Sequence, residues 1–314
     1  MSLNARSFGR YKQWIWLIAL GVLSDCKNPP DSRKIYDTPT SGTIHISVDE
    51  SFKPVIDSQI KVFESSYPEA KIIAHYKSEA DCLKDLTNDS IRMVIITKPL
   101  TRDEEKFLKD TLGFTPQQEQ LAYDAISVIV NNQSKDTIFD MSEIRSLLKG
   151  TSGYPYKVVM DGLNSTSTVR FVKDSVIKGQ SFGSNVVAAT SSVGVIDYVA
   201  ANRDAIGFVG VNWIGDENDS TRLSFDGKVK VASLECETCR PIAYTKPYQA
   251  NIGLKRYPMV RSLYGIVKEN YRGLGSGFVN FLIYERGQLI FRKAYLWPGR
   301  VGLTIRKASI NENE

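Results

Sequence analysis

The part of the sequence best suited to bind an anion is a run of four consecutive hydroxyl side chains. They are Ser165, Thr166, Ser167 and Thr168, at the expected start of a helix. Hydroxyl oxygens are favoured there because they accept hydrogen bonds from backbone N–H groups that have no partner within the helix. One cap uses one such oxygen, so the run has hydroxyls to spare. Because helix starts also attract negative charge, the pattern indicates an oxyanion-binding turn, with an ordinary capped helix as the alternative.

Three further hydroxyl side chains fall where an expected strand gives way to an expected helix. They are Ser51, Ser78 and Thr97. Each on its own could simply cap the helix that follows it. In parallel α/β sheets, however, ligands gather at the carboxyl ends of the strands. Because the three residues occur in succession on the same kind of edge, we expect them to face one cleft.

The elements that must position these residues alternate between strands and helices. Strands are expected at 43–48, 70–76 and 92–97, each followed by a segment with apolar residues at helical spacing. A long apolar strand at 122–132 leads the chain into a second series of the same kind. This alternation predicts an α/β fold whose mostly parallel sheet is covered by helices on both faces. Near the end of the chain, residues 276–296 predict one long helix.

Composition excludes several classes of protein. The 314 residues are 42% hydrophobic and 24% charged, as in ordinary globular proteins. The net charge of +5 comes with no dense Lys/Arg stripe, so we expect no nucleic-acid partner. With only two His in the chain, neither a zinc site nor a histidine-based catalytic triad is expected, and we predict no metal and no cofactor. Cys236 and Cys239 predict either a local disulfide or free thiols.

The N-terminus has the order of an export signal. Three basic residues precede a short apolar run at 14–23, which is too short for a stable membrane span. Cys26 follows it and resembles the lipidated Cys of bacterial lipoproteins, although Asp25 departs from that pattern. We expect residues 1–26 to be a signal peptide that ends at the lipidated Cys26, and residues 27–42 to be a flexible tether. An uncleaved N-terminal anchor is the alternative.

Six segments carry a resemblance to a known family. They are AYDAISVIVN (122–131), EIRSLLKG (143–150), the STST turn with Phe171, AIGFVGV (205–211), YPMVRSLY (257–264) and FVNFLIYERGQLIFRKAYLWPG (278–299). Over residues 42–302 the chain resembles the periplasmic solute-binding proteins of phosphate ABC transporters. The resemblance implies a two-lobed, type II periplasmic-binding-protein fold, with a mixed, mostly parallel sheet flanked by helices in each lobe and hinge strands between them. Lobe I is expected to comprise residues 43–123 and 245–309, and lobe II residues 124–244.

The same resemblance implies a binding site between the lobes. Members of the family hold phosphate with donors from loops that precede helices. By position, the implied ligand contacts in this chain are Ser51, Phe52, Ser78, Thr97, Ser165, Thr166 and Ser167.

Two diagnostic positions depart from the family pattern. Thr97 stands where the family has an Asp that accepts the proton of hydrogen phosphate, and Asp161 stands where it has an Arg that pairs with the phosphate charge. The loss of the Arg matters because its two parallel donors clamp an oxyanion. We expect Lys98 to restore the positive charge and Asp161 to supply the proton acceptor. The alternative is that Lys98 points to water and Asp161 only forms the turn before the helix.

The resemblance implies an exported receptor, not an enzyme, that captures an inorganic oxyanion, with phosphate as the first choice. Its partners would be that oxyanion and the membrane permease of an ABC transporter, to which it delivers the ligand as a monomer. The implied location is the periplasm of a Gram-negative bacterium, with a lipid anchor in the membrane. The alternatives are a different small anion, a sensor lipoprotein on the same fold, and an exported serine hydrolase using Ser165 or Ser167.

Overall fold

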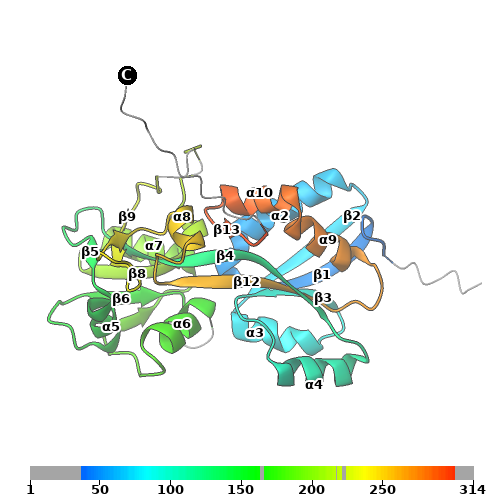
Figure 1. The fold of residues 1–314 in the computed structure, drawn as a ribbon, viewed down its shortest axis with the longest axis horizontal. Helices are drawn as coiled ribbons and strands as arrows, with labels where there is room; N and C mark the ends of the chain where they lie inside the picture. The colour runs from blue at the N-terminus through cyan, green and yellow to red at the C-terminus, as the bar shows by residue number, and fades with distance from the viewer. Residues whose placement is uncertain (1–36, 163–165, 217, 221–223, 301–314) are drawn as a thin grey trace, which may run out of the picture. The chain divides into compact units, whose positions relative to one another are not determined.

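The computed structural model describes residues 37–162, 166–216, 218–220 and 224–300 (Figure 1). The expected signal peptide, Cys26, most of the expected tether and Ser165 lie outside these residues. At the end of that tether, the Asp37 carboxylate accepts a hydrogen bond from Leu274 N at 2.6 Å, so the chain contacts the folded body before the first strand begins. Within the described residues, no helix combines the length and the apolar content needed to cross a membrane.

The first half of the fold is a sheet that ends on a long shared strand. β1 (Gly42–Asp49) lies between β2 (Ala70–Lys77) and β3 (Ile91–Ile96) and is parallel to both. β12 (Val260–Val267) is antiparallel to β3 and to the first part of β4 (Gln117–Val130). The three N-terminal strands are therefore parallel, as predicted, and a strand from late in the chain separates them from β4.

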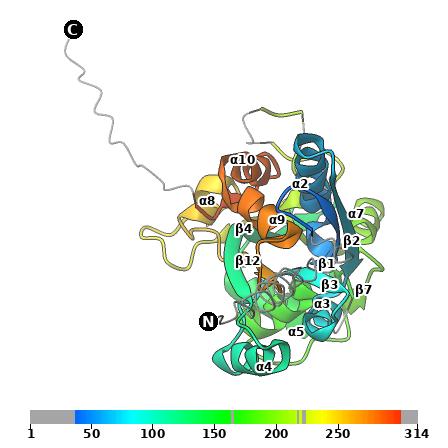
Figure 2. The ribbon, with the colours of Figure 1, turned by 90° about the vertical axis from the view of Figure 1, so that its right-hand side faces the viewer.

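Helices cover both faces of this half (Figures 1 and 2). They are α2 (Lys53–Ser66), α3 (Glu79–Lys84), α4 (Arg102–Leu112) and α9 (Leu274–Ile283). Side chains alternate along β3, so Val94 and Ile96 pack in one apolar cluster with Cys82 of α3 and Leu108 of α4. The intervening Met93 and Ile95 belong to the main core, which includes side chains of α2 and α9. Burial on both faces explains why β3 is apolar throughout.

β4 continues into the second half of the fold. Its last part is antiparallel to β8 (Ala205–Gly210). β6 (Lys157–Met160) is parallel to β8 and to β7 (Val186–Ala188), which gives the full order β2-β1-β3-β12-β4-β8-β6-β7. The helices of this half are α5 (Met141–Lys149), α6 (Ser167–Phe171) and α7 (Ser192–Ala201). Two mixed sheet halves flanked by helices confirm the predicted fold class.

The fold also contains several shorter elements. They are β5 (Ile138–Phe139), β9 (Lys230–Val231), β10 (Ser233–Glu235), β11 (Tyr244–Thr245), β13 (Trp297–Pro298), α8 (Gln249–Gly253), α10 (Glu285–Lys293) and the 3-10 turn η1 (Glu50–Phe52). β5, β10 and β11 form a small separate sheet. Directly after β10, Cys236 and Cys239 form a disulfide, which is one of the two states that the sequence predicts.

The prediction of one long helix at 276–296 is wrong. The chain forms α9 and α10 instead, and Tyr284 between them is extended, with φ −95° and ψ 176°. Gly287 makes the change of direction possible, because a Cβ at this position would lie 2.3 Å from Phe281 O. Helical spacing of apolar residues predicted the helical segments but could not reveal the break, because both helices present their apolar faces to the same core.

Candidate functional site

The described part of the hydroxyl run, Thr166 to Thr168, lies at the start of α6, as predicted. Thr166 is the N-cap residue: its Oγ1 accepts a hydrogen bond from Val169 N at 3.3 Å and contacts Asp161 Oδ1 at 3.1 Å. One expected ligand contact therefore serves as an ordinary cap. Ser167 and Thr168 are fully buried beside it, although neither is needed to cap the helix.

Ser167 lies against Ser51, which comes from the other half of the sheet. Their Oγ atoms are 3.3 Å apart, and Ser51 Oγ is 3.5 Å from Asp161 Oδ2. Ser51 follows β1 and Asp161 follows β6, so the carboxyl ends of strands in both halves meet here, as in ligand sites of such folds. Ser192, at the start of α7, donates to Asp161 Oδ2 at 3.4 Å. This third hydroxyl was not predicted: it follows Ser191, which caps α7, and a Ser at the start of a helix is usually read as part of its cap.

The loop that carries Ser51 is held in place by several hydrogen bonds. Ser51 N donates to Asp49 Oδ1 at 3.0 Å. Ser51 O accepts from Trp213 Nε1 at 2.7 Å and from Asn212 Nδ2 at 3.1 Å. Phe52, the next predicted contact, is completely buried. These bonds hold the backbone of Ser51 in place, two of them through residues of the second half.

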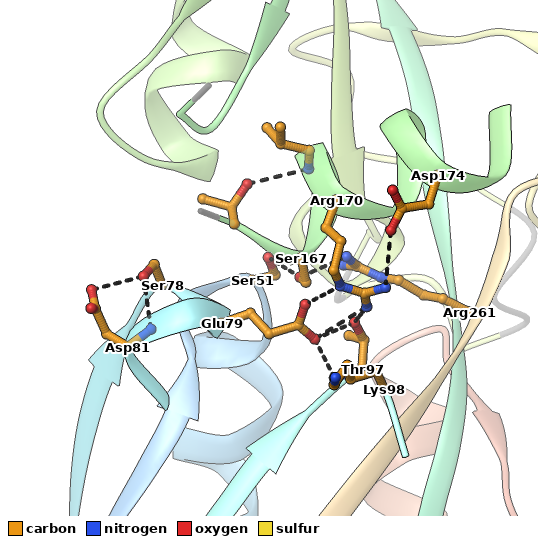
Figure 3. A network of polar contacts seen from close by, with 12 residues as sticks. Ser51, Ser78, Glu79, Asp81, Thr97, Lys98, Ser167, Arg170, Asp174 and Arg261 are labelled. Carbon is orange, nitrogen blue, oxygen red and sulfur yellow. Dashed lines mark hydrogen bonds and ion pairs between the residues drawn. The ribbon is translucent and has the colours of Figure 1, made fainter. Parts of the chain in front are cut away.

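A buried arginine that the sequence analysis did not select joins this cluster (Figure 3). Arg261 lies on β12 directly opposite Asp124 on β4, and its Nε donates to Asp124 Oδ2 at 2.8 Å. Its Nη1 donates to Ser167 Oγ at 2.8 Å, and its Cζ lies 5.0 Å from the centre of the Phe52 ring. The side chain is nearly inaccessible, with 4% of the residue exposed. The sequence did contain a signal: Arg261 is the one charged residue of β12, and Asp124 is the one charged residue in the apolar part of β4, 121–130. Buried charges are normally paired with an opposite charge.

Several buried polar atoms of this cluster have no hydrogen-bond partner among the described residues. They are Arg261 Nη2, Asp49 Oδ2, Asp124 Oδ1 and Thr168 Oγ1. Buried polar groups are nearly always paired, because an unpaired one loses its bonds to water without compensation. We call Ser51, Ser167, Thr168, Arg261, Asp49, Asp124 and Asp161 the Arg261 cluster. Its unpaired donors and acceptors suit a small ligand that both accepts and donates hydrogen bonds.

Two carboxyl groups of the cluster titrate near neutral pH. Burial raises the pKa of Asp161 to about 7, the negative charge of Asp49 adds to this effect, and Arg261 opposes it. Burial likewise raises the pKa of Asp49 to about 6, against the attraction of Arg261. Each group can therefore carry a proton close to neutrality. The cluster thus combines one permanent positive charge with carboxyl groups that can either accept or donate a hydrogen bond.

Thr97 lies in a second set of contacts, next to the Arg261 cluster (Figure 3). Its N and Oγ1 donate to Glu79 Oε1, at 2.8 and 2.6 Å, and its Oγ1 accepts from Arg170 Nη2 at 2.8 Å. Arg170 Nε also donates to Glu79 Oε2 at 2.5 Å. We call Glu79, Thr97 and Arg170 the Arg170 bridge. It was not predicted, because its three members come from three separate elements.

The structure does not place Ser78 and Lys98 in the Arg261 cluster. Ser78 caps α3: it accepts from Asp81 N at 3.3 Å and donates to Asp81 Oδ2 at 2.8 Å. Lys98 Nζ pairs with Glu104 Oε1 at 2.7 Å. Both side chains thus have partners within the first half of the fold. No group of three or more His, Cys, Asp or Glu side chains in the described part of the chain is arranged to hold a metal ion.

Comparison with known proteins gives the family. A family model described as a PBP superfamily domain matches residues 36–286. The chain belongs to the PBP superfamily. No curated protein matches its sequence.

Solved structures share the fold of this superfamily member. A putative phosphate ABC transporter substrate-binding protein with bound phosphate from Clostridium perfringens aligns with a TM-score of 0.69 at 18% identity, over 82% of this chain and 100% of that one. An ABC-type phosphate transport receptor from Vibrio cholerae has a TM-score of 0.61 at 17% identity, over 81% and 99%. A possible phosphate-binding protein from Planctomyces limnophilus has a TM-score of 0.55 at 18% identity, over 82% and 93%. At these identities the likeness establishes the fold.

Proposed function

We propose that this protein is a solute-binding protein that captures an inorganic oxyanion, with phosphate as the first choice, and does not transform it. The observation that carries the proposal is the Arg261 cluster, in which hydroxyls from both halves of the sheet surround one buried guanidinium. The relatives of known structure named above, whose descriptions refer to phosphate, point to the same ligand. The two halves would act as the lobes, with residues 43–123 and 245–309 in one and 124–244 in the other.

Arg261 takes over the role that the sequence analysis gave to Lys98. Asp161 occupies the position where the resembled family has its arginine, so the positive charge must come from elsewhere. Arg261 Nη1 already reaches Ser167, and its Nη2 has no partner among the described residues. A guanidinium held in this way presents a fixed donor to an oxyanion. Ser51, Phe52 and Ser167 would complete the contacts, and Thr166 would cap α6 beside them. These contacts do not include Ser78, Thr97, Ser165 and Lys98, which stay predictions from the sequence.

The carboxyl groups of the cluster favour an anion that carries a proton. Asp49, Asp124 and Asp161 surround a single arginine, so a fully deprotonated anion would meet strong repulsion. Hydrogen phosphate can donate its own proton to a carboxylate, or accept one from a protonated carboxyl group. Sulfate has no proton to donate at neutral pH. We therefore expect phosphate and arsenate to bind and sulfate to be rejected.

A ligand panel tests the proposal. Phosphate, arsenate, sulfate, molybdate and small carboxylates are titrated into the protein by calorimetry after the ligand carried through purification has been removed by unfolding and refolding. The expected result is binding of phosphate and arsenate, with sulfate at least about 100-fold weaker, in line with about 3 kcal/mol for an unpaired buried carboxylate. Binding of molybdate or a carboxylate in preference to phosphate would assign a different small anion. No binding of any of these ligands would contradict the proposal.

The remaining parts of the proposal concern location and partners. The protein would be exported by residues 1–26, anchored by a lipid at Cys26, and held in the periplasm of a Gram-negative bacterium. As a monomer it would deliver its ligand to an ABC permease or, alternatively, report occupancy as a sensor. Metabolic labelling with a fatty-acid analogue tests the anchor: label that disappears in Cys26→Ser supports it, and unlabelled wild-type protein contradicts it.

A hydrolase is disfavoured by the placement of its possible nucleophiles. The sequence contains one GxSxG run, Gly179–Gly183, but Ser181 lies exposed in the loop before β7. A nucleophile elbow needs this motif between a strand and a helix. Ser167 contacts Arg261, the hydroxyl of Ser51 and the carboxylate of Asp49, so the partner in these contacts that could accept its proton is an aspartate and not the histidine of a serine hydrolase. These contacts support a receptor that binds and releases its ligand unchanged.

A further inference from the structure

The Arg170 bridge joins the two halves of the sheet beside the Arg261 cluster. Glu79 is the first residue of α3, and Thr97 follows β3, so both belong to the first half. Arg170 lies on α6, which follows β6 in the second half. In sequence, Arg170 is 91 residues from Glu79 and 73 residues from Thr97. The bridge is therefore a long-range contact that exists only when the two halves are close together.

The bridge is built entirely from protein groups. Arg170 contacts both carboxylate oxygens of Glu79, Nε to Oε2 at 2.5 Å and Nη2 to Oε1 at 3.3 Å. Thr97 N and Oγ1 donate to Oε1 as well, so the carboxylate accepts four hydrogen bonds. Glu79 is 1% exposed, whereas the Arg170 side chain is 34% exposed. Two-pronged bonds between an arginine and a buried carboxylate are among the strongest in proteins.

Separation of the two halves would break only part of this arrangement. Glu79 would keep the two donors of Thr97, because both residues lie in the same half. It would lose both bonds from Arg170, and Thr97 Oγ1 would lose its bond from Arg170 Nη2. The three bonds from Arg170 thus stabilise the closed arrangement of the two halves and are absent from an open one. A ligand that binds the closed arrangement gains apparent affinity in proportion to the fraction of molecules already closed.

We propose that Arg170 and Glu79 are positioning residues that latch the two lobes together and so set the affinity and release rate of the oxyanion. This inference rests on the proposed function for its ligand, but the latch itself can be detected without any ligand. Arg170 and Glu79 act through closure of the lobes rather than by touching the anion. Thr97 serves the latch by holding the Glu79 carboxylate toward Arg170.

The test compares two latch variants with a matched control. Arg170→Met removes the cation, and Glu79→Gln keeps the shape of the side chain while removing its charge. Arg145→Met is the control, because Arg145 pairs with Glu237 at 2.6 Å with a similarly exposed side chain, 32%, but both residues belong to the second half. Small-angle X-ray scattering gives the radius of gyration without phosphate, and stopped-flow measurements give the release rate of inorganic phosphate.

The latch predicts that phosphate-free wild type and Arg145→Met are as compact as their phosphate-loaded forms. Arg170→Met and Glu79→Gln should both expand without phosphate, and both should release phosphate about tenfold faster, as expected for loss of about 1.4 kcal/mol from one charge-assisted pair. Latch variants that scatter and release phosphate like Arg145→Met would overturn the inference while leaving the receptor function intact. If neither the wild type nor any variant binds phosphate, the receptor proposal fails. Expansion of Arg170→Met and Glu79→Gln in small-angle scattering would still support the latch, and its absence would overturn it.

Discussion

The Arg261 cluster and the Arg170 bridge are built from the same kinds of side chain but differ in whether their bonds are satisfied. In the bridge, the Glu79 carboxylate accepts four hydrogen bonds from two residues. In the cluster, Arg261 Nη2 and Asp124 Oδ1 have no partner among the described residues. A fully satisfied set of buried polar groups fixes a geometry, whereas an unpaired buried group is costly and would be stabilised by a ligand that pairs with it. This difference is the basis of the two proposals: closure of the lobes by the bridge, and capture of the anion by the cluster.

Removing the guanidinium of the cluster should have the largest effect. Arg261→Met should weaken phosphate binding about 100-fold, the usual worth of a strong hydrogen bond to a charged group. It should also lower the free energy of unfolding by about 3–5 kcal/mol, because Asp124 is left as an unpaired buried charge. Calorimetric titration and urea denaturation measure the two effects.

The double variant Arg261→Met/Asp124→Asn separates ligand binding from stability. Asp124→Asn removes the buried carboxylate charge that Arg261→Met leaves unpaired. It should therefore restore most of the free energy of unfolding but none of the phosphate affinity. Wild-type affinity in the double variant would show that the arginine serves only the fold. The Arg261 cluster would then stabilise the fold without binding the anion.

Two neighbouring hydroxyls on α6 offer a smaller and sharper contrast. Ser167→Ala should weaken phosphate binding about fivefold, for loss of one hydrogen bond of about 1 kcal/mol. Thr166→Ala should instead cost about 1 kcal/mol of stability as a lost N-cap, with a smaller loss of affinity. Equal effects of the two substitutions on phosphate binding would contradict the separate roles of cap and ligand contact.

The two sites should respond to pH in opposite directions. Burial raises the pKa of Asp161 from 3.8 to about 7 and that of Asp49 from 3.8 to about 6. Between pH 3.8 and these raised values, the folded cluster therefore binds more protons than the unfolded chain does. Its contribution to stability is therefore present at low pH and is lost as pH rises through 6 to 7. Denaturation of the phosphate-free protein at pH 5 and pH 7.5 checks this, and Asp161→Asn should reduce the difference. An unchanged difference would rule out Asp161 as its source.

For the bridge the sign is reversed. Burial acts to raise the pKa of Glu79, but the hydrogen bonds and charge of Arg170, together with the donors of Thr97, outweigh it and lower the pKa below 4.5. The stabilisation is thus present above pH 4.5 and is lost as pH falls through the folded-state pKa. Acidification should therefore expand the phosphate-free protein in small-angle scattering. A radius of gyration that stays constant below pH 4 would contradict this.

Lys98→Ala should have the smallest effect. Lys98 pairs with Glu104, and a partly exposed pair of this kind contributes at most about 1 kcal/mol. Phosphate affinity should stay within about twofold of wild type, whereas a loss near that of Arg261→Met would return Lys98 to the ligand site. Asp161→Ala is the companion measurement, and it should weaken phosphate binding more than Lys98→Ala.

The sequence predicted the parts of this protein that depend on local pattern. Alternating apolar segments predicted the parallel β1, β2 and β3 with helices on both faces. Hydroxyls before helices singled out Ser51 and Ser167, whose Oγ atoms lie 3.3 Å apart in the structure. Periodicity could not show the break at Tyr284, because both flanking helices bury apolar faces in one core. The role of Arg261 could not be predicted, because it depends on strand register. Only the antiparallel pairing of β12 with β4 places Arg261 opposite Asp124. Arg170 and Glu79 meet only through tertiary structure, which no local pattern records.

The most direct test of the central claim is the position of a bound anion. Arsenate has the shape and protonation behaviour of phosphate, and its arsenic atom can be located by anomalous X-ray diffraction from crystals grown with it. The account predicts one strong peak within hydrogen-bond reach of Arg261 and Ser167, with the Arg170 bridge intact beside it. A peak next to Lys98 and Ser78, with the Arg261 cluster unchanged from its ligand-free form, would contradict the account.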